Sequence, residues 1–312
     1  MKRAWLVCSL VCISFYCAQA QQKLTAEQVL QRHTDSVGSS ATLANAKSRV
    51  VEGTAFYRIL TNGTGEFPGK AVMASSDNKF HTLLKTDAQG YHGERFISDG
   101  DGKTSVATTY ANFTRSHFGD FLQRENVPLQ DGLLGGVLTT AWPLIAANFP
   151  KETFQYEGLK KVDGVELHVV GYKPKRKTGL KITLFFEPQT FRHVLTTYVE
   201  QEDAGLARGA IDPNLTPAQG KGASGIANGM AQTANSLSGP DVRTARLRPT
   251  TWMIEERFGN FTTLDGLTLP FHYDLRYQEQ LQNNITNTID WEVRVTGVHN
   301  NIPVDAKNFE IR

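Results

Sequence analysis

Polar and apolar residues alternate strictly after the pair Asp265-Gly266. Six apolar or aromatic residues share one parity of this segment: Leu267, Leu269, Phe271, Tyr273, Leu275 and Tyr277. A period of two is typical of a β-strand with one buried and one solvated face. Asp-Gly suits tight hairpin turns, and Asp163-Gly164 occupies the same position between two other apolar segments. Both pairs therefore predict hairpin corners rather than reactive sites.

Similar strand-like segments, separated by short turn sequences, recur along most of the chain. They cover Arg49–Leu60, Lys70–Ser75, Phe80–Lys85, Tyr91–Ile97, Lys103–Tyr110, Thr153–Leu159, Glu166–Tyr172, Leu180–Phe186, His193–Gln201, Thr251–Phe258, Thr262–Gln280 and Ile289–Val295. A last segment, Asn308–Arg312, is expected to close the sheet. Successive strands joined by short turns predict an antiparallel meander.

One amphipathic helix is predicted before the first strand. Thr25 is a good N-cap with Gln28 three residues further on, and apolar residues follow at helical spacing until Gly38.

Helical spacing returns in the middle of the chain, between Phe118 and Trp142. The second helix predicted there contains Gly135 and Gly136, each of which lowers helix propensity by about 1 kcal/mol. We expect it to pack closely against the sheet or to move.

Between Asp203 and Pro249 neither periodicity survives, and Gly, Ala, Ser, Asn and Pro dominate. We interpret 203–249 as a flexible insertion between two neighbouring strands. It is either a tolerated surface insertion, since closure entropy rises slowly with loop length, or a segment that folds on a partner.

The N-terminus has the pattern of a secretory signal. Lys2 and Arg3 precede an apolar stretch that ends at Ala18-Gln19-Ala20. This stretch is shorter than the roughly 20 residues that a membrane span needs, and no later stretch is long enough. We therefore predict a cleaved signal at 1–20, no transmembrane span in the mature chain, and one domain at 21–312.

The composition of the mature chain excludes several classes of function. Its cysteines, Cys8, Cys12 and Cys17, all lie in the signal, which excludes disulfides and thiolate chemistry and favours a bacterial periplasm. Removing two of 33 basic residues leaves 31 against 31 acidic ones, so the formal charge is zero. The mature chain therefore lacks the excess of basic residues that is typical of nucleic-acid-binding proteins.

Motifs for catalysis or metal binding are weak. The eight histidines form no HxH or HExxH pattern, and the turn at Asp99–Lys103 lacks the ligands of a calcium loop. Ser224 lies among glycines but lacks the G-x-S-x-G spacing. We expect no metal, no cofactor and no catalytic residue, hence a protein that is not an enzyme.

One apolar surface stands out. Nine residues are expected to point to the same side of neighbouring strands: Leu184, Phe186, Trp252, Ile254, Phe258, Leu269, Phe271, Tyr273 and Trp291. This face is either an ordinary core or the lining of an apolar cavity left by a curved sheet. In the second interpretation, five residues of the glycine-containing helix form a lid: Leu133, Leu134, Val137, Leu138 and Trp142.

Several stretches together resemble a known family. They are "SDGDGKT" (98–104), "LKITLFFEPQTFRHVLTTYVEQ" (180–201), "LDGLTLPFHYDLRY" (264–277) and "NNIPVDAKNFEIR" (300–312). In this order, after a signal and one helix, they resemble the periplasmic lipoprotein carrier LolA and its relatives, which include mycobacterial lipid-binding lipoproteins and the sensor RseB. The chain departs from the carriers in its length, its insertion and the apolar segment 132–144.

The resemblance implies an α+β fold, in which a half-open, strongly curved antiparallel β-barrel is covered by a few helices. It also implies an apolar cavity that binds acyl chains without chemical reaction. The leading hypothesis is a periplasmic binding or carrier protein for a hydrophobic small molecule, a lipid or a lipidated protein. The alternative is an envelope sensor or adaptor with a filled core, which contacts a protein partner through a sheet edge or through 203–249.

Deletion of 203–249 separates the two hypotheses. We expect a binding protein to keep its ligand, because the insertion lies outside the predicted sheet, and native mass spectrometry of detergent-free protein to show the same lipid-sized mass. A sensor that uses the insertion would lose its partner. Loss of the ligand on deletion would contradict the placement of the binding site in the sheet.

Overall fold

The computed structural model describes residues 24–61, 65–145, 153–201, 249–281 and 285–311. Twelve strands form one antiparallel sheet in the order β5-β4-β3-β2-β1-β12-β11-β10-β9-β8-β7-β6. They are β1 (Ser48–Ile59), β2 (Gly65–Ser76), β3 (Lys79–Thr86), β4 (Gly93–Ser98), β5 (Thr104–Thr108), β6 (Phe154–Val162), β7 (Val165–Tyr172), β8 (Lys181–Phe186), β9 (His193–Gln201), β10 (Pro249–Leu264), β11 (Leu267–Leu281) and β12 (Thr286–Asn300).

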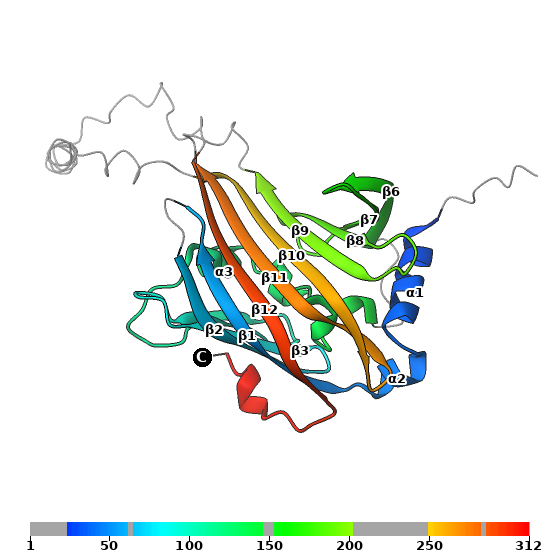
Figure 1. Cartoon of the computed structure of the whole chain (residues 1–312), viewed down its shortest axis with the longest axis horizontal. Coiled ribbons are helices and arrows are strands. Elements are labelled where there is room, and N and C mark those ends of the chain that lie inside the picture. Colours follow the sequence, from blue (N-terminus) through cyan, green and yellow to red (C-terminus); the bar gives the residue numbers. More distant parts are fainter. Residues whose placement is uncertain (1–23, 62–64, 146–152, 202–248, 282–284, 312) are drawn as a thin grey trace, which may run out of the picture.

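The sheet consists of two meanders joined at its centre. β1 to β5 form one meander and β6 to β12 the other, and the two meet where β1 pairs with β12, from Arg49 opposite Asn300 to Ile59 opposite Ile289. β5 and β6 are the free edges, so the sheet is curled but not closed (Figure 1). The predicted fold class, a half-open and strongly curved antiparallel barrel with few helices, is confirmed.

Short helices complete the fold. They are α1 (Ala26–Val37), α2 (Ser40–Asn45), α3 (His117–Arg124) and α4 (Val127–Gln130), with 3₁₀ segments η1 (Gly136–Leu138), η2 (Pro143–Ile145) and η4 (Ala306–Phe309). The predicted capping box of α1 is present: Thr25 Oγ1 accepts from Gln28 N at 3.2 Å, and Gln28 Oε1 accepts from Thr25 N at 2.9 Å. The helix buries one face, which includes Val29, Leu30 and His33.

Two local predictions were wrong. No helix spans Leu133–Trp142, because Gly132, Gly135 and Gly136 have φ of +67°, +81° and +49°, whereas an α-helix needs negative φ at every residue. The chain there makes turns and the short η1 instead. The end of the chain adds no strand either, since Asn308 and Phe309 belong to η4 and 310–311 are not in a strand.

Two predicted segments fall outside the described residues. These are the signal at 1–20 and all of the insertion 203–249 except Pro249, the first residue of β10. The strands on either side of the insertion, β9 and β10, pair with each other in the sheet. Within the described ranges, no helix has the length and apolar character that crossing a bilayer requires.

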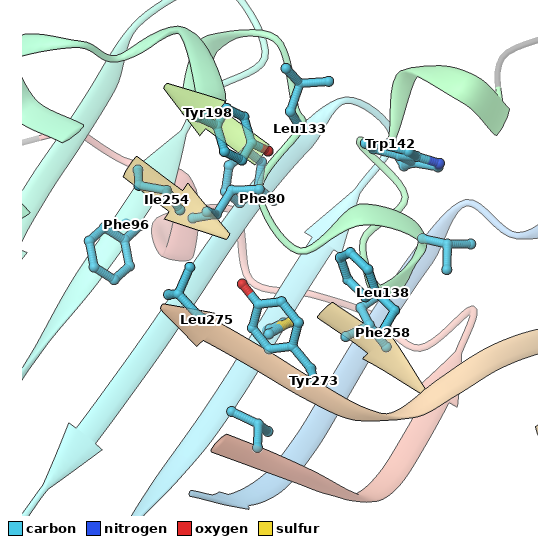
Figure 2. Packing of buried hydrophobic residues seen from close by; sticks show 14 of the residues in the cluster. Phe80, Phe96, Leu133, Leu138, Trp142, Tyr198, Ile254, Phe258, Tyr273 and Leu275 are labelled. Carbon is cyan, nitrogen blue, oxygen red and sulfur yellow. The ribbon is translucent and has the colours of Figure 1, made fainter. Parts of the chain in front are cut away.

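The concave face of the sheet is filled by the chain that follows α4. We define 133–145 as the plug segment. Leu133, Leu138 and Trp142 from this segment are at most 1% exposed, and they belong to the same cluster as Phe258 and Tyr273 of the sheet. Figure 2 shows these side chains together. The apolar face of the sheet is therefore buried by an irregular segment rather than by a helix.

Gly136→Ala should destabilise the protein more than Gly158→Ala. Both glycines have positive φ, +49° and +91°, and an added Cβ costs about 1–2 kcal/mol there. At Gly136 that Cβ would also lie 2.9 Å from Phe258 Cζ, whereas at Gly158 it meets nothing within 4 Å.

Overpacking the buried site adds about 1–3 kcal/mol. We therefore expect urea unfolding to show a total loss of roughly 2–5 kcal/mol for Gly136→Ala. Equal losses for the two variants would contradict tight seating of the plug segment.

Candidate ligand-binding site

The structure brings the nine predicted lining residues together, but in a packed core. Seven are at most 5% exposed, and Trp252 and Phe271 are partly buried against the same cluster: Leu184, Phe186, Trp252, Ile254, Phe258, Leu269, Phe271, Tyr273 and Trp291. The five predicted lid residues join that cluster at 0–1% exposure: Leu133, Leu134, Val137, Leu138 and Trp142. Their contact with a ligand stays a prediction.

Buried polar groups bind the backbone of the plug segment. The carboxylate of Glu256, which is fully buried, accepts hydrogen bonds from Gly135 N at 2.6 Å, Tyr198 Oη at 2.6 Å and Tyr273 Oη at 2.8 Å. Burial raises the pKa of Glu256 to about 7, against the opposing effect of these three bonds. An irregular segment can be buried here because the sheet supplies partners for its backbone.

Three more side chains bind the backbone of the same segment from other elements. Arg49 of β1, only 1% exposed, donates to the Val137 carbonyl and to Asn300 Oδ1, the latter at 2.9 Å. Ser75 Oγ of β2 accepts from the Thr140 backbone N–H at 2.9 Å. Thr34 Oγ1 of α1 donates to the Leu144 carbonyl at 2.9 Å. The plug segment is thus hydrogen-bonded to both halves of the fold.

The plug segment also contacts a buried histidine. His33 Nε2 accepts from the indole N–H of Trp142 at 3.2 Å, and His33 Nδ1 lies 3.1 Å from the Phe191 carbonyl. These partners place the single imidazole proton on Nδ1, because only a donor can face a carbonyl. Burial lowers the pKa of His33 to about 4, although the bond to Phe191 opposes this, so the ring is neutral at neutral pH.

An open pocket lies at one end of the sheet. Its volume is about 400 Å³, and its lining is mainly apolar, from β1, β11, β12 and the residues around the start of α3. Its large side chains are Tyr57, Ile59, Tyr91, Arg115, His117, Tyr277 and Ile289. We call this space the end pocket. Its volume falls within the roughly 300–1,000 Å³ typical of small-molecule sites.

Strand register explains how the end pocket forms. Ile289 of β12 pairs with Ile59 on one side and with Tyr277 of β11 on the other. Tyr57, two residues before Ile59, has its ring 4.9 Å from that of Tyr91. Residues from the first and the last strands of the chain thus form one continuous apolar surface.

Glu94 lies behind one wall of the end pocket. Its fully buried carboxylate accepts from Ser116 N and Ser116 Oγ, both at 2.7 Å, and from Tyr91 Oη at 3.0 Å. Burial raises its pKa, while the bonds from Ser116 and Tyr91 act in the opposite direction. Ser116 is also the N-cap of α3, and a Cβ on Gly119 would lie 2.2 Å from Glu94 Oε1. Glu94 therefore fixes the start of α3 against the sheet.

Glu279 lies behind the other wall and is 5% exposed. It accepts from His117 Nδ1 at 2.6 Å, Asn287 Nδ2 at 2.8 Å and Tyr277 Oη at 3.1 Å. Burial alone would raise its pKa, but these bonds and the charge of His117 lower it overall. The bond to Glu279 in turn raises the pKa of His117. Glu279 is therefore an ionised carboxylate next to Tyr277, outside the lining of the end pocket.

A second, more polar cleft of about 680 Å³ lies between α1, α2 and the end of the plug segment. Trp142 lines it and is the one predicted lid residue that reaches either of these two cavities. Across the described part of the chain, no three His, Cys, Asp or Glu side chains gather as metal ligands would.

Sequence reasoning missed the end pocket. Tyr57, Ile59 and Tyr277 all fall in predicted strands with the correct alternation, which is the one signal that the sequence offers. Their meeting depends on pairing β1 with β12, more than 200 residues away in the chain. Nothing in a local pattern indicates such a pairing.

No protein-family model matches the chain, and no curated protein matches it. Among solved structures, a LolA superfamily protein of Nitrosomonas europaea is 12% identical, with 92% of this chain and 98% of that chain covered and a TM-score of 0.42. An outer membrane lipoprotein-sorting protein domain of Vibrio parahaemolyticus is 10% identical, with 91% and 97% covered and a TM-score of 0.41.

A chain of the Pseudomonas aeruginosa MucA/MucB complex is 10% identical, with 89% and 99% covered and a TM-score of 0.23. These similarities have TM-scores below 0.5, and they assign neither a function nor a ligand to this chain.

Glu256→Gln should remove a pH-dependent loss of stability. Because the pKa of Glu256 rises from its ordinary 4.5 to about 7 on folding, the folded chain holds this proton more tightly than the unfolded chain. The free energy of unfolding therefore falls as pH rises through this interval, by about 3 kcal/mol for such a shift.

We expect urea unfolding to show that, between about pH 5 and about pH 8, the free energy of unfolding of Glu256→Gln rises relative to that of the wild type by up to this amount. Glu166→Gln, at an exposed carboxylate of β7, is the control and should show no such gain. A stability difference that does not change with pH would contradict the account of Glu256.

Proposed function

We propose that the protein is a non-enzymatic binding protein for a small molecule with an apolar part, which it holds in the end pocket. The single observation behind this proposal is an open, largely apolar pocket of about 400 Å³, in a fold whose concave face is otherwise filled. Ile59 at the pocket and the adjacent Leu60 are 38% and 43% exposed, so the apolar surface continues out to solvent.

Binding would be driven by burial of the apolar part of the ligand. Each methylene group removed from water contributes about 0.8 kcal/mol, less the entropy lost on association. Tyr57, Tyr277 and Ile289 offer rigid surfaces for such a chain, because hydrogen bonds or strand packing hold them in the free protein. A preformed pocket lowers the cost of ordering on binding.

The ligand site predicted from the sequence would require a rearrangement in addition to binding in the end pocket. Phe258, Tyr273 and their neighbours could contact an acyl chain only if the plug segment left the concave face. Export through the signal at 1–20 would place the protein in the periplasm, where a lipid or a lipidated protein would be its ligand.

The sensor or adaptor hypothesis also has a specific observation in its favour. The sheet edge at β6 is free, and Leu159 and Val165 beside it are 50% and 57% exposed. An unpaired edge strand with exposed apolar side chains is suited to adding a strand from a partner. Leu159→Lys would then abolish partner binding and leave the end pocket unchanged.

Ile289→Trp should block binding in the end pocket. The larger side chain would occupy space between Ile59 and Tyr277, and we expect the affinity for 1-decanol in calorimetry to fall at least about tenfold. Ala44→Trp places the same side chain in the second cleft and serves as the control, with unchanged affinity expected. Unaltered binding by Ile289→Trp, in a folded variant, would exclude the end pocket as the site.

A further inference from the structure

Five polar side chains that line the end pocket donate hydrogen bonds to carboxylates outside its lining. Tyr91 and Ser116 donate to Glu94. His117, Tyr277 and Asn287 donate to Glu279. All five line the pocket, while the two carboxylates that receive their hydrogens lie behind it. Each of these five side chains has therefore already used a donor in the free protein.

What remains on the wall is electron-rich. A tyrosine or serine hydroxyl that has donated its hydrogen keeps acceptor lone pairs, and an asparagine keeps its carbonyl oxygen. The rings of Tyr57, Tyr91 and Tyr277 add aromatic faces, whose quadrupole attracts cations. Hydrogen bonds from Tyr91 and Tyr277 to carboxylates strengthen this polarity, since they push electron density toward the rings.

The charged groups near the end pocket also favour a positively charged ligand over a negatively charged one. Two carboxylates, Glu279 and Asp120, lie near two basic groups, Arg115 and His117, so the formal charge is −1 with His117 neutral and zero with His117 protonated. Glu94 adds a further negative charge when it is ionised. Arg115 is the strongest donor on the rim, and Asp120 Oδ1 already accepts from its Nε at 2.9 Å. An anionic head group at Arg115 would therefore lie close to Asp120, whose negative charge would repel it.

We propose that the ligand of the end pocket is an amphiphile with a cationic ammonium head and an apolar tail. The head would lie against Tyr91 and Tyr277 with Glu279 behind them, and the tail would follow Ile59 and Ile289 toward solvent. This inference rests on the proposed function, and it adds the charge of the ligand to it. The lowered pKa of Glu279 supports it, because this carboxylate stays ionised at neutral pH.

Three decyl probes test the proposal: decyltrimethylammonium, 1-decanol and decanoate, each titrated into the full-length mature chain below the concentration at which it forms micelles. The tail is constant, so the ratio of affinities reports the head group alone. We expect decyltrimethylammonium to bind about tenfold more tightly than decanoate, from cation–π contact and the carboxylate behind it.

Two variants assign that preference to Glu279. Glu279→Gln removes the charge and should reduce the preference for the cation to about twofold or less. Glu292→Gln is the matched control, because Glu292 is also a salt-bridged carboxylate of low exposure, 8%, but it lines a separate pocket with Arg58 and Arg276. It should leave the preference unchanged. Circular dichroism of both variants confirms that they are folded.

The possible outcomes are distinct. Equal or tighter binding of decanoate, or a cation preference that Glu279→Gln does not reduce, overturns the cationic ligand and leaves an apolar binding site standing. Failure of all three probes to bind the wild type overturns the proposed function itself, and the cationic ligand with it.

Discussion

The fold depends on covering the concave face of a curled sheet. Twelve strands that do not close into a barrel leave a broad apolar surface, and burial of such a surface is the largest favourable contribution to folding. The plug segment covers it with Leu133, Leu138 and Trp142, but it is irregular, so only some of its peptide groups bond to one another, as Leu138 N does to the Gly135 carbonyl. Glu256, Arg49, Ser75 and Thr34 supply the missing partners.

This arrangement leaves a mainly apolar pocket at the end of the sheet rather than in its middle. No residue of the plug segment lines the end pocket, whose walls come from β1, β11, β12 and the residues around the start of α3. The two buried carboxylates Glu94 of β4 and Glu279 of β11 hold that boundary in place, since each belongs to the sheet and binds a residue at the start of α3. The same hydrogen bonds that stabilise the fold therefore decide which polar groups the end pocket presents.

Much of the fold could be predicted from the sequence, because strand alternation, the turns at Asp163 and Asp265 and the cap at Thr25 are local signals. The plug segment could not be predicted in the same way. Its spacing is helical, and only the positive φ at Gly135 and Gly136, which sequence pattern does not reveal, excludes a helix.

The central aromatic residues were placed on the correct face, but the sequence left open whether that face was a filled core or a cavity. That outcome depends on hydrogen bonds such as Gly135 to Glu256, which join residues 121 positions apart. The end pocket depends likewise on the pairing of β1 with β12. Long-range pairing of this kind leaves no trace in a single sequence.

The most direct test of the central claim is a crystal structure of the mature chain with a bound decyl probe. The account predicts electron density for the decyl chain between Tyr57, Tyr277 and Ile289, with the plug segment still against Phe258. Density for the chain against Phe258 and Tyr273, with the plug segment displaced from the concave face, would contradict it.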